Sequence, residues 1–204
     1  MLSEEVAEKD GLFRRARVFR VRKGNESSYK KVFTPFVTHC LASDMLGTQA
    51  GGTSSFGSKG YFALSIGHAY YKEIQLAEKS ETSILSAQYD SDELSKARGF
   101  NDGTSWAKEL KKLVRKDDVI PSIPGLYDLQ AANLSPENLV LAYSFSYYMQ
   151  STPARLASYV KLVERINTSR QVPEPVELAK IFGFETVEEL ETDWKDFIGS
   201  TKFK

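Results

Sequence analysis

The stretch from Tyr29 to Leu46, YKKVFTPFVTHCLASDML, decides the fold class of this chain. Its apolar side chains recur at spacings of three and four residues, which is the period of one face of an α-helix. Pro35 lies near the start of the stretch, where the first turn of a helix tolerates proline. The pattern predicts an amphipathic helix that ends at Gly47. Its apolar positions are Val32, Phe33, Phe36, Val37, Cys40, Leu41 and Met45.

Helical patterns also fill most of the chain after this stretch. A Gly/Ser-rich segment, residues 47–60, is expected to be a flexible connection. Ser135 followed by Pro136 is a helix start, Pro153 opens the next helix, and Thr186 is the N-cap of the last one. The sequence therefore predicts a mainly α fold of about seven helices with little sheet. The other helices are expected over residues 61–79, 104–116, 138–150, 154–168, 176–182 and 187–198, and the prolines of residues 121–125 are expected to interrupt the helical pattern.

Length and composition are those of an ordinary globular protein. The 204 residues suffice for one domain with a buried core. Hydrophobic residues make up 41% and charged residues 26%, which argues against wholesale disorder. Lys plus Arg and Asp plus Glu both total 27, so no global field attracts nucleic acid, and we expect no such partner. The single Cys40 excludes an intramolecular disulfide and a cysteine-based zinc site.

The N-terminal part of the chain differs from the rest. Residues 14–31 are rich in Arg and Lys, and Glu26 is their only acid. Partial alternation of apolar and basic residues predicts a basic arm or an edge strand over residues 1–28, before a helical domain over residues 29–204. A solvated face explains the basic residues more simply than a phosphate or RNA site does. We expect neither a signal peptide nor a membrane span, which leaves the compartment open between the cytoplasm and an exported protein.

Four segments carry motifs that follow one another along the chain: VTHCLAS at residues 37–43, ALSIGHAYYKE at residues 63–73, and the longer segments 139–166 and 178–198. Together they resemble the gluzincin type of zinc metallopeptidase, in its peptidase-like families with a helical C-terminal half. The first two stand where that family has V-x-H-E-L-x-H and W-L-x-E-G-x-A-x-Y-x-E. The resemblance implies a helical, zincin-like fold over about residues 30–198, with little similarity over residues 82–130.

The resemblance also implies a zinc site whose residues this sequence has lost. In the family, two histidines four residues apart and a glutamate of the second motif bind the zinc ion, and the Glu after the first His is the general base. His39 occupies the first ligand place. Cys40 stands at the place of the base, Ser43 at that of the second ligand and Ile66 at that of the third. The resemblance therefore implies an inactive domain with no catalytic residue, no metal and no cofactor.

Some residues near the lost site keep two interpretations. His68 lies two positions after Ile66, about 200° around the helix, and points elsewhere unless that helix is redirected. Tyr71, Tyr143 and Tyr147 are candidates, with His68, for the lining of a cleft. Packing in a helical core is the commoner reason for such aromatic residues.

Simple structural roles are expected for the other residues near these motifs. His39 is expected to bond a neighbouring side chain, and Glu73 to be a solvated acid, as is usual on a helix surface. Cys40 is expected to be a small buried residue. Residues that match the family, among them Leu41 and Gly67, are expected to let the two motif helices pack closely.

These features predict a pseudo-metallopeptidase domain that binds a protein or peptide partner or serves as a structural module. The alternative is an active hydrolase with a relocated metal site or another nucleophile. Zinc content, and its response to His39→Ala, separates the two hypotheses.

Overall fold

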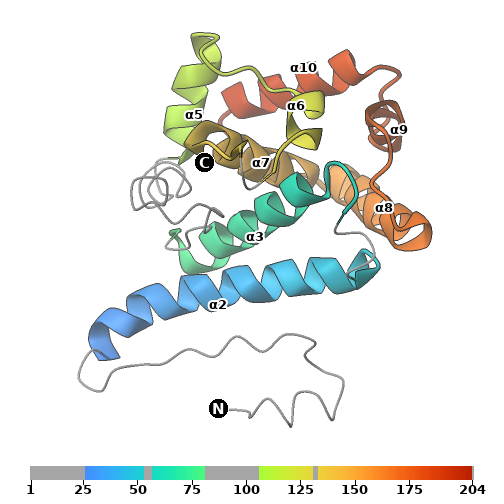
Figure 1. Ribbon diagram of the computed structural model, residues 1–204. Helices are drawn as coiled ribbons and strands as arrows, with labels where there is room; N and C mark the ends of the chain where they lie inside the picture. Colours follow the sequence, from blue (N-terminus) through green and yellow to red (C-terminus); the bar gives the residue numbers. More distant parts are fainter. Residues whose placement is uncertain (1–25, 53–56, 81–105, 131–132, 204) are drawn as a thin grey trace. The chain divides into compact units, whose positions relative to one another are not determined.

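The computed structural model describes residues 26–52, 57–80, 106–130 and 133–203, which form eight helices and no strand (Figure 1). The predicted mainly α fold is confirmed. Residues 1–25 of the predicted arm or strand lie outside the described ranges. The helices are α2 (Glu26–Gln49), α3 (Tyr61–Ala77), α5 (Trp106–Arg115), α6 (Ile123–Tyr127), α7 (Pro136–Met149), α8 (Pro153–Ser169), α9 (Pro175–Ile181) and α10 (Val187–Gly199).

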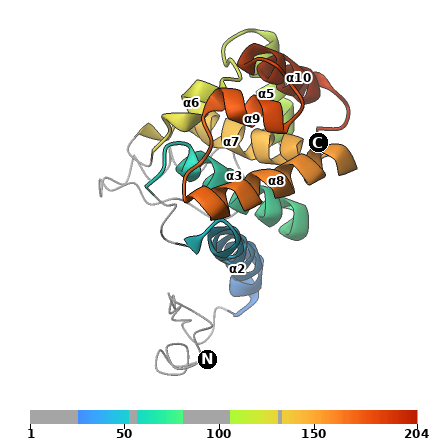
Figure 2. The ribbon, with the colours of Figure 1, turned by 90° about the vertical axis from the view of Figure 1, so that its right-hand side faces the viewer.

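Helix α7 is central to the compact unit formed by Val32–Lys204. Nearly every residue from Leu139 to Met149 is buried, as is typical of a helix that is apolar on all sides. Figures 1 and 2 show α3 on one side of α7, and α5 and α10 on the other. The core is therefore built around α7, with the remaining helices as its cover.

Helices α3 and α7 approach closely at Gly67. A Cβ atom at this position would lie 2.2 Å from the carbonyl oxygen of Ala142 and 2.8 Å from Oγ of Ser146. Only glycine allows so short an approach. The sequence-based expectation was that Gly67 lets α3 pack closely on α2. This is wrong, because Gly67 faces α7, whereas Ser65 and Glu73 of α3 contact α2.

The helix starts follow the capping rules that the sequence indicated. Ser135 accepts a hydrogen bond from a backbone N–H in the first turn of α7, which Pro136 opens. Helix α8 begins at Pro153, as predicted, and α10 begins with a capping box between Thr186 and Glu189. These caps pair backbone N–H groups that have no partner inside the helix.

Two prolines lie in positions that the sequence did not indicate. Helix α2 begins at Glu26, so Pro35 lies well inside it and not in its first turn. One carbonyl of the preceding turn thereby loses its N–H donor, but Pro35 is buried, and its packing offsets part of this loss. Pro124, expected to interrupt the helical pattern, lies in the first turn of α6, where its missing N–H is not needed.

The buried face of α2 differs from the predicted apolar stripe. Leu41 and Met45, both placed in that stripe, are 47% and 59% exposed. Ala42, Leu46 and Ala50 are buried in their place. The stripe is wrong at these two positions because His39 and Ser43 contact α3, which leaves Leu41 and Met45 on the outer side of α2.

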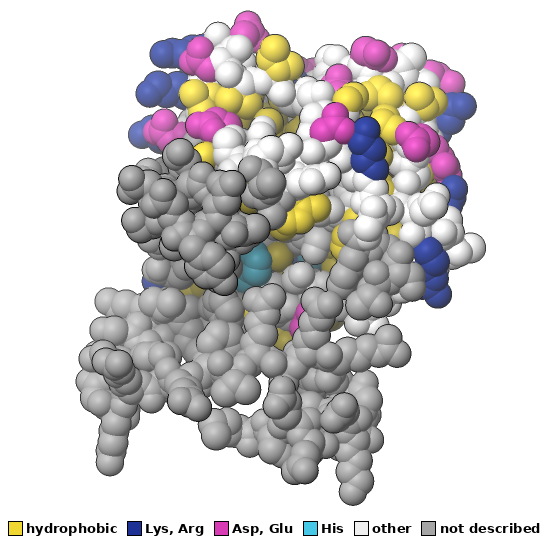
Figure 3. Space-filling model, in the orientation of Figure 1, with side chains coloured by type: hydrophobic (Ala, Val, Ile, Leu, Met, Phe, Trp, Pro, Cys, Tyr) yellow, Lys and Arg dark blue, Asp and Glu magenta, His cyan; other side chains and the backbone are white. Residues whose placement is uncertain are grey.

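Charged side chains of both signs cover the outer helices. On the face drawn in Figure 3, acidic and basic side chains intersperse along the upper edge, without a field of one sign. Some form exposed pairs, such as Lys195 with Asp117 at 2.9 Å and Lys59 with Asp128 at 2.8 Å. No helix within the described ranges is long and apolar enough to cross a membrane.

Candidate functional site

His39, at the first ligand place of the resemblance, is bonded to a carboxylate of the neighbouring helix. Its Nδ1 lies 2.9 Å from Oε2 of Glu73, and its ring meets Tyr70 edge to face at 4.5 Å between centroids. The side chain of His39 is 12% exposed and that of Glu73 is fully buried. A buried carboxylate is costly without partners, so this contact contributes to holding α2 against α3. The expectation that His39 bonds a neighbour is confirmed.

Glu73 is the residue of this contact that sequence reasoning missed. It was expected to be a solvated acid, and that expectation is wrong because Glu73 faces α2. A signal for its burial was present in the sequence. Glu73 follows Tyr70 by three residues and Ile66 by seven, and both are buried positions of one apolar face of α3. The charge of Glu73 predicts an exposed side chain, whereas the periodicity of α3 predicts a buried one, and the periodicity is correct.

Ser43, at the place of the second ligand, also contacts α3, at the residue before Ile66. Oγ of Ser43 lies 3.3 Å from Oγ of Ser65, whereas His39 meets Glu73 eight residues later in α3. Eight residues correspond to about 12 Å along a helix, and the order shows that the two helices run antiparallel. Ile66 is buried beside Ser65 in the chain, two turns away from Glu73. Cys40 is of intermediate exposure, so the expectation of a buried Cys40 is met only in part.

His68 faces helices other than the one that carries His39. Its Nδ1 lies 2.9 Å from the hydroxyl of Tyr159 in α8 and 3.4 Å from Nε2 of Gln150, just after α7. The Gln150 amide nitrogen also donates to the carbonyl oxygen of Ser146. Because an amide nitrogen only donates, Nδ1 of His68 acts as the acceptor, and the ring hydrogen resides on Nε2.

The surroundings of His68 keep its imidazole neutral at pH 7. Burial, and secondarily the nearby charge of Lys72, lowers the pKa of His68 to about 4. Burial also raises the pKa of Tyr159, so its hydroxyl stays protonated and can donate. The result is a neutral histidine whose second nitrogen, Nε2, offers an N–H group. No hydrogen bond to Nε2 is found in the part of the chain that the structure describes.

The tyrosines considered for a cleft lie within an aromatic cluster. Tyr71 and Tyr143 are buried, and Tyr147 is partly buried. The ring of Tyr147 lies 5.1 Å from that of Tyr71 and 5.6 Å from that of Phe203, and Tyr143 contacts Trp106 at 5.4 Å. Burial raises the pKa of both Tyr71 and Tyr143. These contacts are those of a packed core between α3, α5, α7 and the C-terminal residues.

A narrow apolar crevice lies beside His68. It is formed by the end of α2, the start of α3 and the inner face of α8. Tyr159 belongs to its wall and also bonds His68, so the crevice and the polar group of His68 meet at this residue. The lining residues are Leu46, Ala50, Tyr61, Leu64, Tyr159, Leu162, Val163 and Ile166.

Comparison with known proteins gives no further guide. Among the described residues, no three His, Cys, Asp or Glu side chains form a group that could hold a metal ion. No family model, no curated protein and no solved structure matches the chain. The residues themselves are therefore the basis for any functional proposal.

Proposed function

We propose that the chain is a catalytically inactive, gluzincin-like module that binds a protein or peptide partner. The best support comes from the contacts of His39 and Ser43, which stand at the two histidine ligand places of the resemblance. His39 bonds the buried Glu73 and Ser43 bonds Ser65, so both serve the contact between α2 and α3.

The chemistry of the substituted residues supports the same proposal. A serine hydroxyl and an isoleucine side chain are not ligands that replace histidine and glutamate at a zinc ion. Cys40, at the place of the general base, is adjacent to His39 in a helix, and adjacent helical side chains diverge by about 100°. The pair is therefore poorly arranged for a thiol activated by a neighbouring imidazole.

Exposed apolar side chains favour a binding role over a purely structural one. Leu41 and Met45 lie one turn apart on the outer side of α2, and Leu156 and Val160 do so on α8, where they are 44% and 48% exposed. Apolar side chains grouped on helix surfaces are frequent in protein interfaces. A helix or an extended peptide is a partner of suitable size for such helical faces.

A relocated metal site is the second candidate function, because of the pair of His39 and Glu73. Zinc bonds of about 2 Å would place two ligand atoms of one ion roughly 3 Å apart, close to the 2.9 Å between these side chains. Catalytic zinc sites use three protein ligands. Within the described ranges no third His, Cys, Asp or Glu joins the pair, so this candidate is the weaker one.

Metal analysis separates the two candidates. The purified chain is incubated with excess zinc chloride at pH 7 and desalted, and bound zinc is measured by mass spectrometry for the wild type and for His39→Ala. We expect far less than one zinc ion per chain in both proteins, and no zinc-dependent cleavage of a mixed peptide library. One zinc ion per wild-type chain that is lost in His39→Ala would overturn the proposal in favour of the metal site.

A further inference from the structure

Phe203 inserts its side chain into the aromatic cluster from a short segment that follows α10. Helix α10 ends at Gly199, and the two residues before Phe203 are exposed, whereas Phe203 itself is fully buried. Three aromatic rings of α7 and α10 surround it, with centres between 5.6 and 5.9 Å from its own; they belong to Tyr143, Tyr147 and Phe197. One aromatic side chain thus anchors a segment whose preceding residues lie in solvent.

Two side chains of other helices bind the backbone of the same segment. Nζ of Lys111, in α5, donates to the carbonyl oxygen of Phe203 at 2.7 Å, and the hydroxyl of Tyr147, in α7, donates to that of Lys202 at 3.2 Å. The amine of Lys111 also lies 5.9 Å from the centre of the Phe203 ring, within reach of a cation–π contact. Lys111 and the three aromatic side chains are named the Phe203 site. Such a site, with donors for the backbone and a place for one side chain, has the features of peptide recognition.

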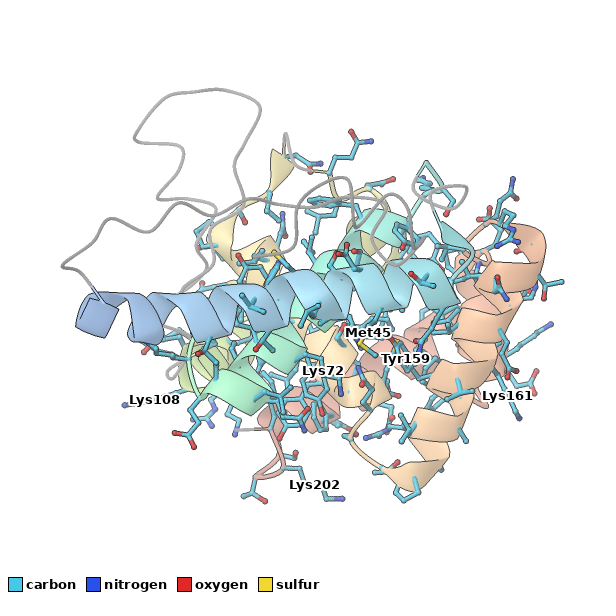
Figure 4. All side chains as sticks on the ribbon, turned by 90° about the horizontal axis from the view of Figure 1, so that it is seen from below. Met45, Lys72, Lys108, Tyr159, Lys161 and Lys202 are labelled. Atoms are coloured by element: carbon cyan, nitrogen blue, oxygen red, sulfur yellow. The ribbon has the colours of Figure 1, made fainter. Side chains whose placement is uncertain are left out.

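Few other interactions hold this segment. Oγ of Ser200 donates to the carbonyl oxygen of Phe197 and accepts from the N–H group of Lys202, so both of these hydrogen bonds are local. In Figure 4 the side chain of Lys202 projects from the edge of the molecule, and it is exposed. Release of Phe203 breaks no hydrogen bond within α5, α7 or α10. Segments with few contacts are those that open at the lowest cost in free energy.

We propose that the Phe203 site binds an extended segment of a partner polypeptide that carries a phenylalanine, and that residues 200–203 close the site until the partner replaces them. The chain's own segment shows which chemistry fits: an aromatic side chain, its carbonyl group and the carbonyl group before it. The exposed side chains of Thr201 and Lys202 place no demand on the residues that precede the phenylalanine. The site rests on the proposed function, for which it specifies the partner.

The closing segment should make the partner bind more weakly. Because it belongs to the same chain, it competes at a high effective concentration. The apparent affinity for a partner then falls in proportion to the fraction of molecules in which the site is open. Substitution of Phe203 opens the site and changes none of the four residues that form it, so the substitution should reveal the binding.

Titration of the full chain with two short peptides tests the proposal. Wild type and Phe203→Ala are titrated with acetyl-Thr-Lys-Phe-amide, which repeats residues 201–203, and with acetyl-Thr-Lys-Ala-amide, while backbone amide signals are followed by NMR. We expect the phenylalanine peptide to bind Phe203→Ala at least tenfold more tightly than the wild type and to shift signals of α5, α7 and α10. The alanine peptide should bind neither protein. Equal affinities of the two proteins, or no binding of the phenylalanine peptide to Phe203→Ala up to its solubility, would contradict the site.

Further variants test the contribution of Lys111 and guard against misfolding. In the Phe203→Ala chain, Lys111→Gln should weaken binding of the phenylalanine peptide at least fivefold, whereas Lys108→Gln, at an exposed lysine of the same helix (Figure 4), should not change it. Equal affinities of these two variants would refute the role of Lys111. If the NMR spectrum shows that Phe203→Ala is unfolded, Phe203→Leu takes its place, and it should still bind the peptide more tightly than the wild type does.

The outcome is independent of the metal analysis. None of the residues of the Phe203 site is involved in the zinc measurement. Failure of the peptide to bind would leave the inactive module standing, and stoichiometric zinc would overturn that proposal separately.

Discussion

His39 and His68 lie on adjacent helices in different surroundings. His39 meets the buried carboxylate of Glu73, whereas His68 meets the hydroxyl of Tyr159 and the amide of Gln150. Neutral partners and burial offer little to compensate a charge on His68, and the nearby Lys72 opposes that charge. This residue is therefore a source of pH dependence in the stability of the domain.

The stability of the domain is expected to fall as His68 becomes protonated. Its pKa is lowered from 6.5 to about 4 in the folded chain, so between these values the unfolded chain binds more protons than the folded one. The contribution of neutral His68 to the free energy of unfolding is then fully present above about pH 6.5 and declines as the pH falls toward 4. The difference corresponds to about 3 kcal/mol. Urea unfolding at pH 7, 6, 5 and 4 measures it.

Comparison with His68→Gln isolates this contribution from the other titrating groups. Glutamine retains a hydrogen-bonding side chain but does not titrate, so its stability should depend less on pH over the same range by about 3 kcal/mol. Parallel curves for the wild type and His68→Gln would show that His68 binds its proton equally in the folded and unfolded chain.

The sequence predicted a part of the local chemistry at this scale. It predicted that His39 bonds a neighbour, because a lone histidine on a partly apolar helix face has few other roles. It did not predict that the neighbour is Glu73, since two helices must be placed side by side before a partner 34 residues away can be named. The periodicity of α3 indicates that Glu73 is buried, but only the packing of α2 on α3 identifies His39 as its partner.

At the scale of helices, Gly67 controls how closely α3 and α7 pack. In Gly67→Ala, the added methyl group would lie 2.2 Å from the carbonyl oxygen of Ala142, which belongs to the backbone and cannot rotate away. The two helices must separate, and contacts along both are weakened. We expect a loss of about 2–4 kcal/mol in the free energy of unfolding, measured by urea denaturation.

Gly199→Ala is the matched control for this prediction. Gly199 ends α10 and has no neighbour within 4 Å of an added Cβ atom. Alanine favours the helix there, so this variant should be as stable as the wild type or more stable by up to about 1 kcal/mol. A similar, small effect for both substitutions would mean that α3 and α7 adjust to a wider spacing without cost.

Helix ends were easier to predict than helix faces, for a physical reason. Ser135, Pro136 and Thr186 act within one turn of their own helix, so the local sequence contains the whole interaction. The buried face of α2 depends on what α3 presents to it. The stripe with Leu41 and Met45 has the period of a helix, but the contacts of His39 and Ser43 select a different side.

For the unit Val32–Lys204 as a whole, burial falls from the centre toward α2. Helix α7 is enclosed between α3, α5 and α10, whereas α2 packs one side against α3 and leaves Leu41 and Met45 in solvent (Figures 1 and 2). Local opening costs the least free energy where few apolar contacts are broken. Helix α2 should therefore open without unfolding of the core, and the polar contact of His39 with Glu73 should be among the interactions that oppose this opening.

Amide hydrogen exchange, measured by mass spectrometry on the full chain, tests this order of stability. We expect the slowest exchange in α7, because its amides require global unfolding, and faster exchange in the described part of α2. His39→Ala removes one hydrogen bond from the buried Glu73 and should lower the opening free energy of α2 by about 1–3 kcal/mol. The opening free energy of α7 should fall by less. Gln49→Ala, at an exposed position of the same helix, should leave both unchanged. If α2 exchanged as slowly as α7, or if His39→Ala accelerated both helices equally, then α2 would be a cooperative part of the core.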